Sequence, residues 1–259
     1  EFRRVLFRSG DFDPDQMIAT IDKYFGGLKP NPDLPKLDLP KETPITAPVV
    51  REILGPDAES VALAWRFPGA ADKDVETLQV VSQILYNGQA GLIDLDLTQQ
   101  QKTLSAYCYP MTMSDYSAFM MQGRPKQGQT LDEVKDLLLG ELKKLREGDF
   151  DEKMLEANIN NFKLYQMQQL ENNDARADMF VESFVNGSDW ADEVTALDRM
   201  SKLTKDDIVA FANKYLKDDN YAVIYKKQGK DPNEKKMSKP EITPIVMNRD
   251  TVSTFLKEI

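Results

Sequence analysis

The sequence predicts an α+β fold: a layered, antiparallel-rich mixed sheet with helices packed on one face. Three neighbouring segments lead to this prediction. Residues 60–67 alternate apolar and polar side chains and end at a Pro-Gly pair, which is typical of a strand followed by a turn. Residues 74–86 place apolar side chains three and four positions apart, on one face of a helix. Residues 104–109 and 116–122 are then two further strands, joined as a hairpin.

The segment before this central unit predicts one helix and a long connector. Asp13 is a helix-capping residue and Pro14 occupies the first helical position, so we expect a helix from here to about Phe25. Its apolar residues share one face, and we expect their burial to make the helix important for stability. Six prolines within residues 30–48 favour an extended connector. Residues 49–54 are a candidate first strand of the sheet.

The part of the chain after the central unit predicts four more helices and one strand. In chain order these elements are residues 130–148, 151–170, 175–185, 204–215 and 221–226. The first helix starts with a capping box at residues 130–133, and a break is expected at Asn172 and Asn173. Residues 228–259 lose this periodicity, and we interpret them as a linker towards a missing next domain.

The composition excludes several kinds of function. The net charge of −10 argues against nucleic acid as a partner, because nucleic-acid binding requires a basic surface. No run of 18 apolar residues exists, so no membrane span is expected. The chain contains no histidine, which excludes Ser-His-Asp and Cys-His triads and histidine-bound zinc within it. The single cysteine, Cys108, lies in a strand pattern, where we expect a buried and inert thiol.

Acidic residues are numerous but form no recognisable site. Asp94 and Asp96 lie two positions apart, and a catalytic or metal-binding role would require convergent partners that the sequence does not identify. We therefore expect both on a solvated face. The hairpin tyrosines Tyr107, Tyr109 and Tyr116 are expected to pair across the strands rather than to form a binding platform. An open sheet edge would still allow an extended peptide to bind as an added strand.

Several motifs, in their order and spacing, resemble the insulinase/pitrilysin family of inverted-zincin zinc peptidases over roughly residues 10–230. They are GDFDP at residues 10–14, KYFG at 23–26, SVALAWRFPGA at 60–70, QIL at 83–85, LTKDDI at 203–208 and NYAVIY at 220–225. The resemblance implies an α+β fold of the mitochondrial processing peptidase-like metallohydrolase type. It also implies similar domains that together enclose a peptide-degrading chamber.

In this family, an H-x-x-E-H element and a downstream glutamate bind zinc and activate water. Because the chain has no histidine, the resemblance implies a non-catalytic domain that follows the zinc domain. Such a domain is not an enzyme on its own and holds no cofactor, whereas zinc is expected in the neighbouring catalytic domain. The implied partners are that catalytic domain of the same polypeptide and a peptide substrate. The sequence does not identify the compartment, and a periplasmic or secreted full-length protein is the hypothesis that we carry forward.

The resemblance also suggests how the chain is divided. Residues 1–9 are basic, unlike the acidic remainder, and we interpret them as a non-native or mismatched segment. The other divisions are a strand-helix remnant of the preceding unit at 10–28, the proline-rich connector at 29–52, the non-catalytic domain at 53–227 and the linker at 228–259.

One residue is a candidate for substrate binding. The family's non-catalytic half often carries an arginine seven residues before a tyrosine that reaches the substrate. Tyr107 matches this tyrosine, but Gln100 stands at the arginine position, which favours a structural role for Tyr107.

Two functions of the domain remain open: a wall of the peptide-binding chamber, or a catalytically dead scaffold or protein-interaction subunit of the same fold. An H-x-x-E-H element encoded upstream would favour the first, and an unrelated α+β binding module is a third hypothesis.

Overall fold

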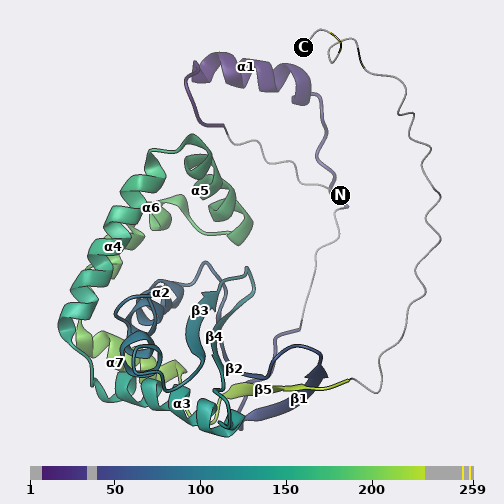
Figure 1. Ribbon diagram of the computed structural model, residues 1–259. Helices are drawn as coiled ribbons and strands as arrows, with labels where there is room; N and C mark the ends of the chain where they lie inside the picture. Colours follow the sequence, from purple (N-terminus) through teal and green to yellow (C-terminus); the bar gives the residue numbers. More distant parts are fainter. Residues whose placement is uncertain (1–7, 34–39, 231–252, 254–256, 258–259) are drawn as a thin grey trace, which may run out of the picture.

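The computed structural model describes residues 8–33 and 40–230, together with Ser253 and Lys257. Within these residues, one sheet has five strands in the order β1-β5-β2-β4-β3 (Figure 1). The strands are β1 (Val49–Gly55), β2 (Ser60–Pro68), β3 (Ser105–Met111), β4 (Tyr116–Arg124) and β5 (Tyr221–Gln228). β1 and β5 pair in parallel and the other neighbours are antiparallel, which confirms the predicted antiparallel-rich mixed sheet. The expected boundary between the connector (29–52) and the non-catalytic domain (53–227) falls inside strand β1.

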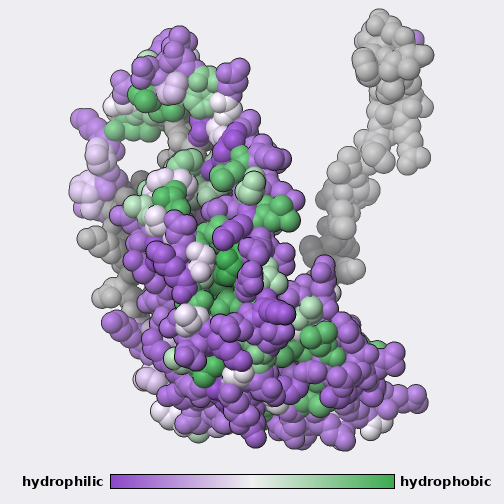
Figure 2. All heavy atoms as spheres, turned by 90° about the vertical axis from the view of Figure 1, so that its left-hand side faces the viewer, coloured by the Kyte–Doolittle hydropathy of each residue, from purple (hydrophilic) through white to green (hydrophobic). Residues whose placement is uncertain are grey.

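Helices cover one face of this sheet. The helical elements are α1 (Pro14–Phe25), α2 (Asp74–Leu85), η1 (Asp94–Thr98), α3 (Leu131–Glu147), α4 (Glu152–Leu170), α5 (Asn173–Asn186), α6 (Trp190–Met200) and α7 (Lys205–Tyr215). Helices α2 and α3 contact the strands, and α7 packs against both of them. Helices α4, α5 and α6 form an outer layer, in which α4 leads away from the sheet towards α5 (Figure 1). The side on which α4 lies is mostly hydrophilic, with small hydrophobic groups between (Figure 2).

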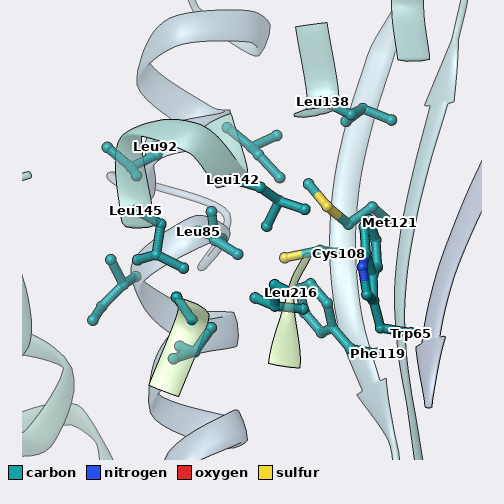
Figure 3. Close-up of a cluster of buried hydrophobic side chains, with 14 of the residues drawn as sticks. Trp65, Leu85, Leu92, Cys108, Phe119, Met121, Leu138, Leu142, Leu145 and Leu216 are labelled. Atoms are coloured by element: carbon teal, nitrogen blue, oxygen red, sulfur yellow. The ribbon is translucent and has the colours of Figure 1, made fainter. Parts of the chain in front are cut away.

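The core lies between the sheet and these helices. Leu63, Trp65 and Phe67 of β2 are each at most 1% exposed, because alternate strand residues point to the same face. Figure 3 shows strand residues Trp65, Phe119 and Met121 facing leucines such as Leu142 of α3. The indole N–H of Trp65 donates to the carbonyl of Lys217 at 3.1 Å, so this buried polar group has a partner.

The predicted burial of the thiol is confirmed. Cys108 lies in the same core and is 4% exposed (Figure 3). Burial raises the pKa of its thiol, which favours the protonated form over the nucleophilic thiolate.

Local capping sets where the helices begin and end. At the start of α3, the Thr130 hydroxyl accepts the Glu133 N–H at 3.2 Å, and the Glu133 carboxylate accepts the Thr130 N–H at 2.7 Å. Gly148 ends this helix with a φ of 72°, in the left-handed region that favours glycine. Asn172 separates α4 from α5 and caps α5, which confirms the predicted break. Helix α6 was not predicted, and Met200 is its one buried residue.

Helix α1 forms as expected, but its predicted burial is wrong. Asp13 caps it by accepting the N–H groups of Asp15 and Gln16 at 2.9 and 3.1 Å. No residue of α1 is buried: Met17 and Ile21 are half-buried, and the helix lies apart from the sheet (Figure 1). An apolar helical face indicates that something should cover it, but not which part of a protein does so.

Two predicted segments lie largely outside the described residues. The structure describes Arg8 and Ser9 of the N-terminal segment at residues 1–9, and the predicted linker at residues 228–259 is described at 228–230 and at two further positions. Both interpretations therefore stay predictions.

Candidate functional site

The face of the sheet opposite the helices is here called the open face. Along β2, every second residue from Ala62 to Pro68 points to this face and is half-buried, whereas the residues between them are buried. Strand β4 alternates in the same way from Tyr116 to Gln122. Helices α2, α3 and α7 lie together on the other side of the sheet (Figure 1), whereas on the open face Glu42 and Thr43 contact Tyr116 and Arg66.

Small side chains occupy the middle of the open face. In the strand register, Ala64 lies between Met120 and Ala222, and Ala62 lies between Gln122 and Ile224. We call the four small residues the alanine floor: Ala62, Ala64, Ala118 and Ala222. The larger residues that border it on the same face are Tyr107, Tyr109, Met111, Met120 and Ile224. An alanine side chain extends by one carbon, so these four side chains are shorter than those of the bordering tyrosines and methionines.

Tyr107, the candidate substrate-binding residue, lies on this border. Its hydroxyl donates to Oε1 of Gln122 at 2.5 Å. Its ring centroid lies 6.1 Å from that of Tyr109 and 6.3 Å from that of Tyr86. The hydroxyl is therefore engaged within the sheet, and a substrate contact of Tyr107 stays a prediction.

The surroundings of Tyr107 differ from the expected tyrosine pairs. The register places Tyr107 opposite Gln122, Tyr109 opposite Met120 and Tyr116 opposite Pro68, so the tyrosines do not pair across strands. Tyr107 and Tyr109 instead stack along one strand, at an interplanar angle of 20°. The Gln100 amide donates to Asp96 at 3.3 Å, which leaves it outside the Tyr107 contacts.

The expectation that Asp94 lies on a solvated face is wrong. Asp94 is 4% exposed and lies at the start of η1. Its Oδ2 accepts the backbone N–H groups of Asn87, Gly88 and Gly91, each at 3.0 Å. These three bonds hold the loop after α2 in place and satisfy the buried carboxylate. Asp94 therefore has a structural role that its sequence neighbourhood did not indicate.

Asp96, two positions further, takes part in a separate ion-pair cluster. Lys144 of α3 lies 2.7 Å from Asp96 and 3.1 Å from Glu141. Glu141 is 3% exposed, and burial raises the pKa of its carboxyl group against the opposing effect of Lys144. The cluster joins η1 to α3. Across the two described ranges, no three acidic or cysteine side chains converge as metal ligands do.

One cavity belongs to the outer helices rather than to the alanine floor. It has a volume of 690 Å³ and lies between α4, α5, α6 and the tip of the β3–β4 hairpin. Its acidic lining residues are Asp174, Asp178, Glu182 and Glu193. The remaining lining is neutral, so the cavity shows a negative surface but no arrangement of catalytic groups.

Comparison with known proteins places this arrangement in a family. The model of the peptidase M16 inactive domain matches residues 3–162. The chain belongs to the peptidase M16 family. The "Zinc protease PqqE" of Helicobacter pylori is a relative of this M16 chain, 24% identical over 229 residues, which cover 86% of the chain and 51% of the relative. The chain thus spans about half the length of the curated relative it matches.

Solved structures confirm the M16 fold. A protease from Helicobacter pylori superposes with a TM-score of 0.77 at 22% sequence identity. The match covers 85% of this chain and 53% of the Helicobacter chain. A peptidase M16 inactive domain from Pseudomonas fluorescens superposes with a TM-score of 0.71 at 16% sequence identity, over 85% of this chain and 52% of the Pseudomonas chain. The periplasmic protease PqqL from Escherichia coli superposes with a TM-score of 0.64 at 14% sequence identity, over 84% of this chain and 26% of PqqL. The resemblance inferred from the sequence motifs is therefore confirmed for family and fold.

The residues that bind zinc in this family are missing from the sequence. The whole chain lacks histidine, the residue that the family's zinc element requires twice. Among the described helices, none combines the length and apolar character that a membrane crossing requires.

Proposed function

We propose that this M16 domain forms part of the wall of a peptide-binding chamber and supports proteolysis by a separate zinc domain. The observation that carries the proposal is the difference between the two faces of the sheet. One face is covered by α2, α3 and α7, while the other presents the apolar alanine floor. A low apolar floor with aromatic and methionine borders suits an extended peptide whose side chains alternate in direction.

The position of α1 supports the division of the chain. Its half-buried Met17 and Ile21 and exposed Ile18 share an apolar side that no described residue covers fully. We assign residues 10–28 to the preceding unit, whose surface would cover this side. The connector at residues 29–52 would then join the catalytic unit to this one.

The chemistry of cleavage belongs to that other unit. Zinc would be held by the neighbouring catalytic domain of the same polypeptide, because this chain offers none of the histidines that the family's element uses. The domain alone would therefore have no peptidase activity. A periplasmic location is proposed by analogy with PqqL, which is described as a periplasmic protease.

A second function is favoured by one observation. Gln100 replaces the family's arginine and donates to Asp96, and the Tyr107 hydroxyl is engaged by Gln122. Both potential substrate contacts are thus used internally, which suits a catalytically dead scaffold or interaction subunit of the same fold.

Reconstitution separates these functions. The zinc domain encoded upstream is assayed on an unstructured peptide, alone and mixed with this chain. If the domain is a chamber wall, the mixture cleaves faster than the zinc domain alone. Ala64→Arg places a charged side chain in the floor. It should reduce the gain in cleavage rate by about tenfold, which corresponds to a loss of about 1.4 kcal/mol in binding free energy.

A matched control uses the same change elsewhere. Ala191→Arg adds the same side chain at an exposed position of α6, in the outer layer, and should leave the gain unchanged. Equal rates with and without this chain would contradict the wall and favour the scaffold. Equal losses in both arginine variants would show that the open face has no special part.

A further inference from the structure

The connector is attached to the open face by two side chains. The Glu42 N–H donates to the Tyr116 hydroxyl oxygen at 3.1 Å. Nη1 of Arg66 donates to the carbonyl of Thr43 at 2.9 Å. Arg66 comes from β2 and Tyr116 from the neighbouring β4, so adjacent strands hold adjacent connector residues.

These two side chains act as one unit. The Arg66 guanidinium lies 5.5 Å from the centroid of the Tyr116 ring, within the range of a cation–π contact. Nη2 of Arg66 also lies 4.0 Å from the Glu42 carboxylate. We call Arg66 and Tyr116 the connector clamp. Removal of either side chain should loosen the other, because each restricts the position of its neighbour.

The chain between the clamp and the sheet is restricted as well. Ile45 is half-buried and lines a 520 Å³ cavity together with Phe67 and Pro68 of β2. Pro44 and Pro48 fix their own φ angles and donate no backbone hydrogen bond. An extended, proline-rich segment makes no internal hydrogen bonds, so its path depends on bonds to other elements. The clamp supplies such bonds at Glu42 and Thr43.

We propose that Arg66 and Tyr116 are positioning residues that fix the connector at Glu42 and Thr43 against the open face. The chain from Glu42 to β1 then moves with the sheet and holds the preceding unit at a fixed starting point. That unit is thereby delivered to the side of the alanine floor. This inference deepens the proposed function, since a chamber wall must face the unit that cleaves.

Amide hydrogen exchange of the chain tests the clamp directly. Tyr116→Phe removes the acceptor of the Glu42 N–H and keeps the aromatic ring under Arg66. We expect exchange at Glu42 to become about tenfold faster, since this hydrogen bond is its protection. Tyr109→Phe is the matched control, because it removes a hydroxyl from the same face but outside the cavity lining, and Glu42 should not respond. Unchanged exchange in Tyr116→Phe would overturn the proposal.

A distance measurement tests the positioning role. Spin labels at Lys41→Cys in the connector and Lys143→Cys on α3 report how the connector lies relative to the domain, while the buried Cys108 stays unlabelled. We expect a narrow distance distribution, which broadens in Arg66→Gln while the melting temperature stays within a few degrees of the parent. An equally narrow distribution in Arg66→Gln would contradict the clamp.

The two proposals can fail separately. Exchange and distances are measured on this chain alone, without a zinc domain or a peptide. A functioning clamp with no gain in the cleavage mixture would refute the wall and leave the clamp intact. A gain in cleavage together with an unresponsive Glu42 amide would refute the clamp and leave the wall intact.

Discussion

The two faces of the sheet use the same strands for different purposes. In β2, Leu63 and Trp65 are almost fully buried under the helices, whereas Ala62 and Ala64, their direct neighbours, form part of the half-buried floor. The covered face of β2 combines large apolar side chains that pack under the helices, whereas the open face of the same strand carries two alanines. This difference indicates that the covered face supplies stability, and under the proposed function the open face contacts another body. Stability and binding should therefore respond to different residues of one strand.

The largest effect is expected on the covered face. Trp65→Ala removes a ring that packs against Phe119 and Tyr221 and leaves a cavity. The free energy of unfolding should fall by about 3–5 kcal/mol. Urea denaturation measures this change, and Arg66→Ala, one position along on the open face, serves as the control. Similar losses in both variants would break the comparison between the faces.

A smaller effect is expected at the buried carboxylate behind the covered face. Asp94→Ala leaves the N–H groups of Asn87, Gly88 and Gly91 without their acceptor. The loss in unfolding free energy should be roughly 1–3 kcal/mol. Asp96→Ala, which removes a partly exposed partner of Lys144, should cost less. The reverse order would mean that Asp94 is not the anchor of its loop.

A pH-dependent effect is expected where α2 meets α7. Burial raises the pKa of Asp74, but hydrogen bonds from Lys214 and Tyr215 and the lysine charge outweigh it and lower the pKa overall. Since the folded-state pKa lies below the unfolded one, this stabilisation is present above about pH 4 and is lost as the pH falls. Because the group is partly exposed, the contribution should be below about 1 kcal/mol.

Thermal melts at several pH values check this sign. The parent should lose more stability than Asp74→Asn between pH 7 and pH 3, and the two should converge at the acid end. If Asp74→Asn melts at a higher temperature than the parent at pH 7, the Asp74 carboxylate destabilises the fold at that pH.

On the open face, Tyr107→Phe should have little effect on stability. It removes the hydroxyl bond to Gln122 and keeps the ring contacts with Tyr86 and Tyr109, so the cost should be below about 1 kcal/mol. The gain in peptide cleavage by the mixture should also persist. A loss of that gain without a loss of stability would assign the hydroxyl to the substrate and sharpen the separation of the faces.

The smallest effect is expected from removing α1. A chain that starts at Lys29 loses a helix with no buried residue, so its unfolding free energy should change by less than about 1 kcal/mol. Differential scanning calorimetry measures this change. A large destabilisation would mean that α1 packs on the domain in solution.

The sequence predicted elements that local rules determine. The capping box at Thr130 and the glycine at Gly148 bound α3 as expected, because their hydrogen bonds lie within a few residues. The partner of α1 was not predictable, since an apolar face does not specify what covers it. Asp94 was missed for a similar reason: its acceptor role requires a loop that brings Asn87 and Gly91 to it.

The candidate site was only partly predictable. Tyr107 was identified from the family pattern, but the alanine floor was not, because the alternation of residues 60–67 predicts a strand without indicating which face the helices cover. The signal lies in residue size, since large and small apolar residues alternate in Leu63, Ala64 and Trp65. Arg66 and Tyr116 carry no local signal of a shared partner, because they lie 50 positions apart and meet only through strand pairing.

The burial of Cys108 has a consequence for redox chemistry. Oxidation and disulfide exchange proceed through an exposed thiolate, and this sulfur is both covered by the core and kept protonated. Because it is the one cysteine of the chain, the domain offers no accessible thiol to an oxidant while it is folded. Modification of Cys108 by a thiol reagent should therefore require unfolding, and its rate would report how often the core opens. Thiol–disulfide chemistry should accordingly leave the folded domain unchanged in oxidising and reducing surroundings alike.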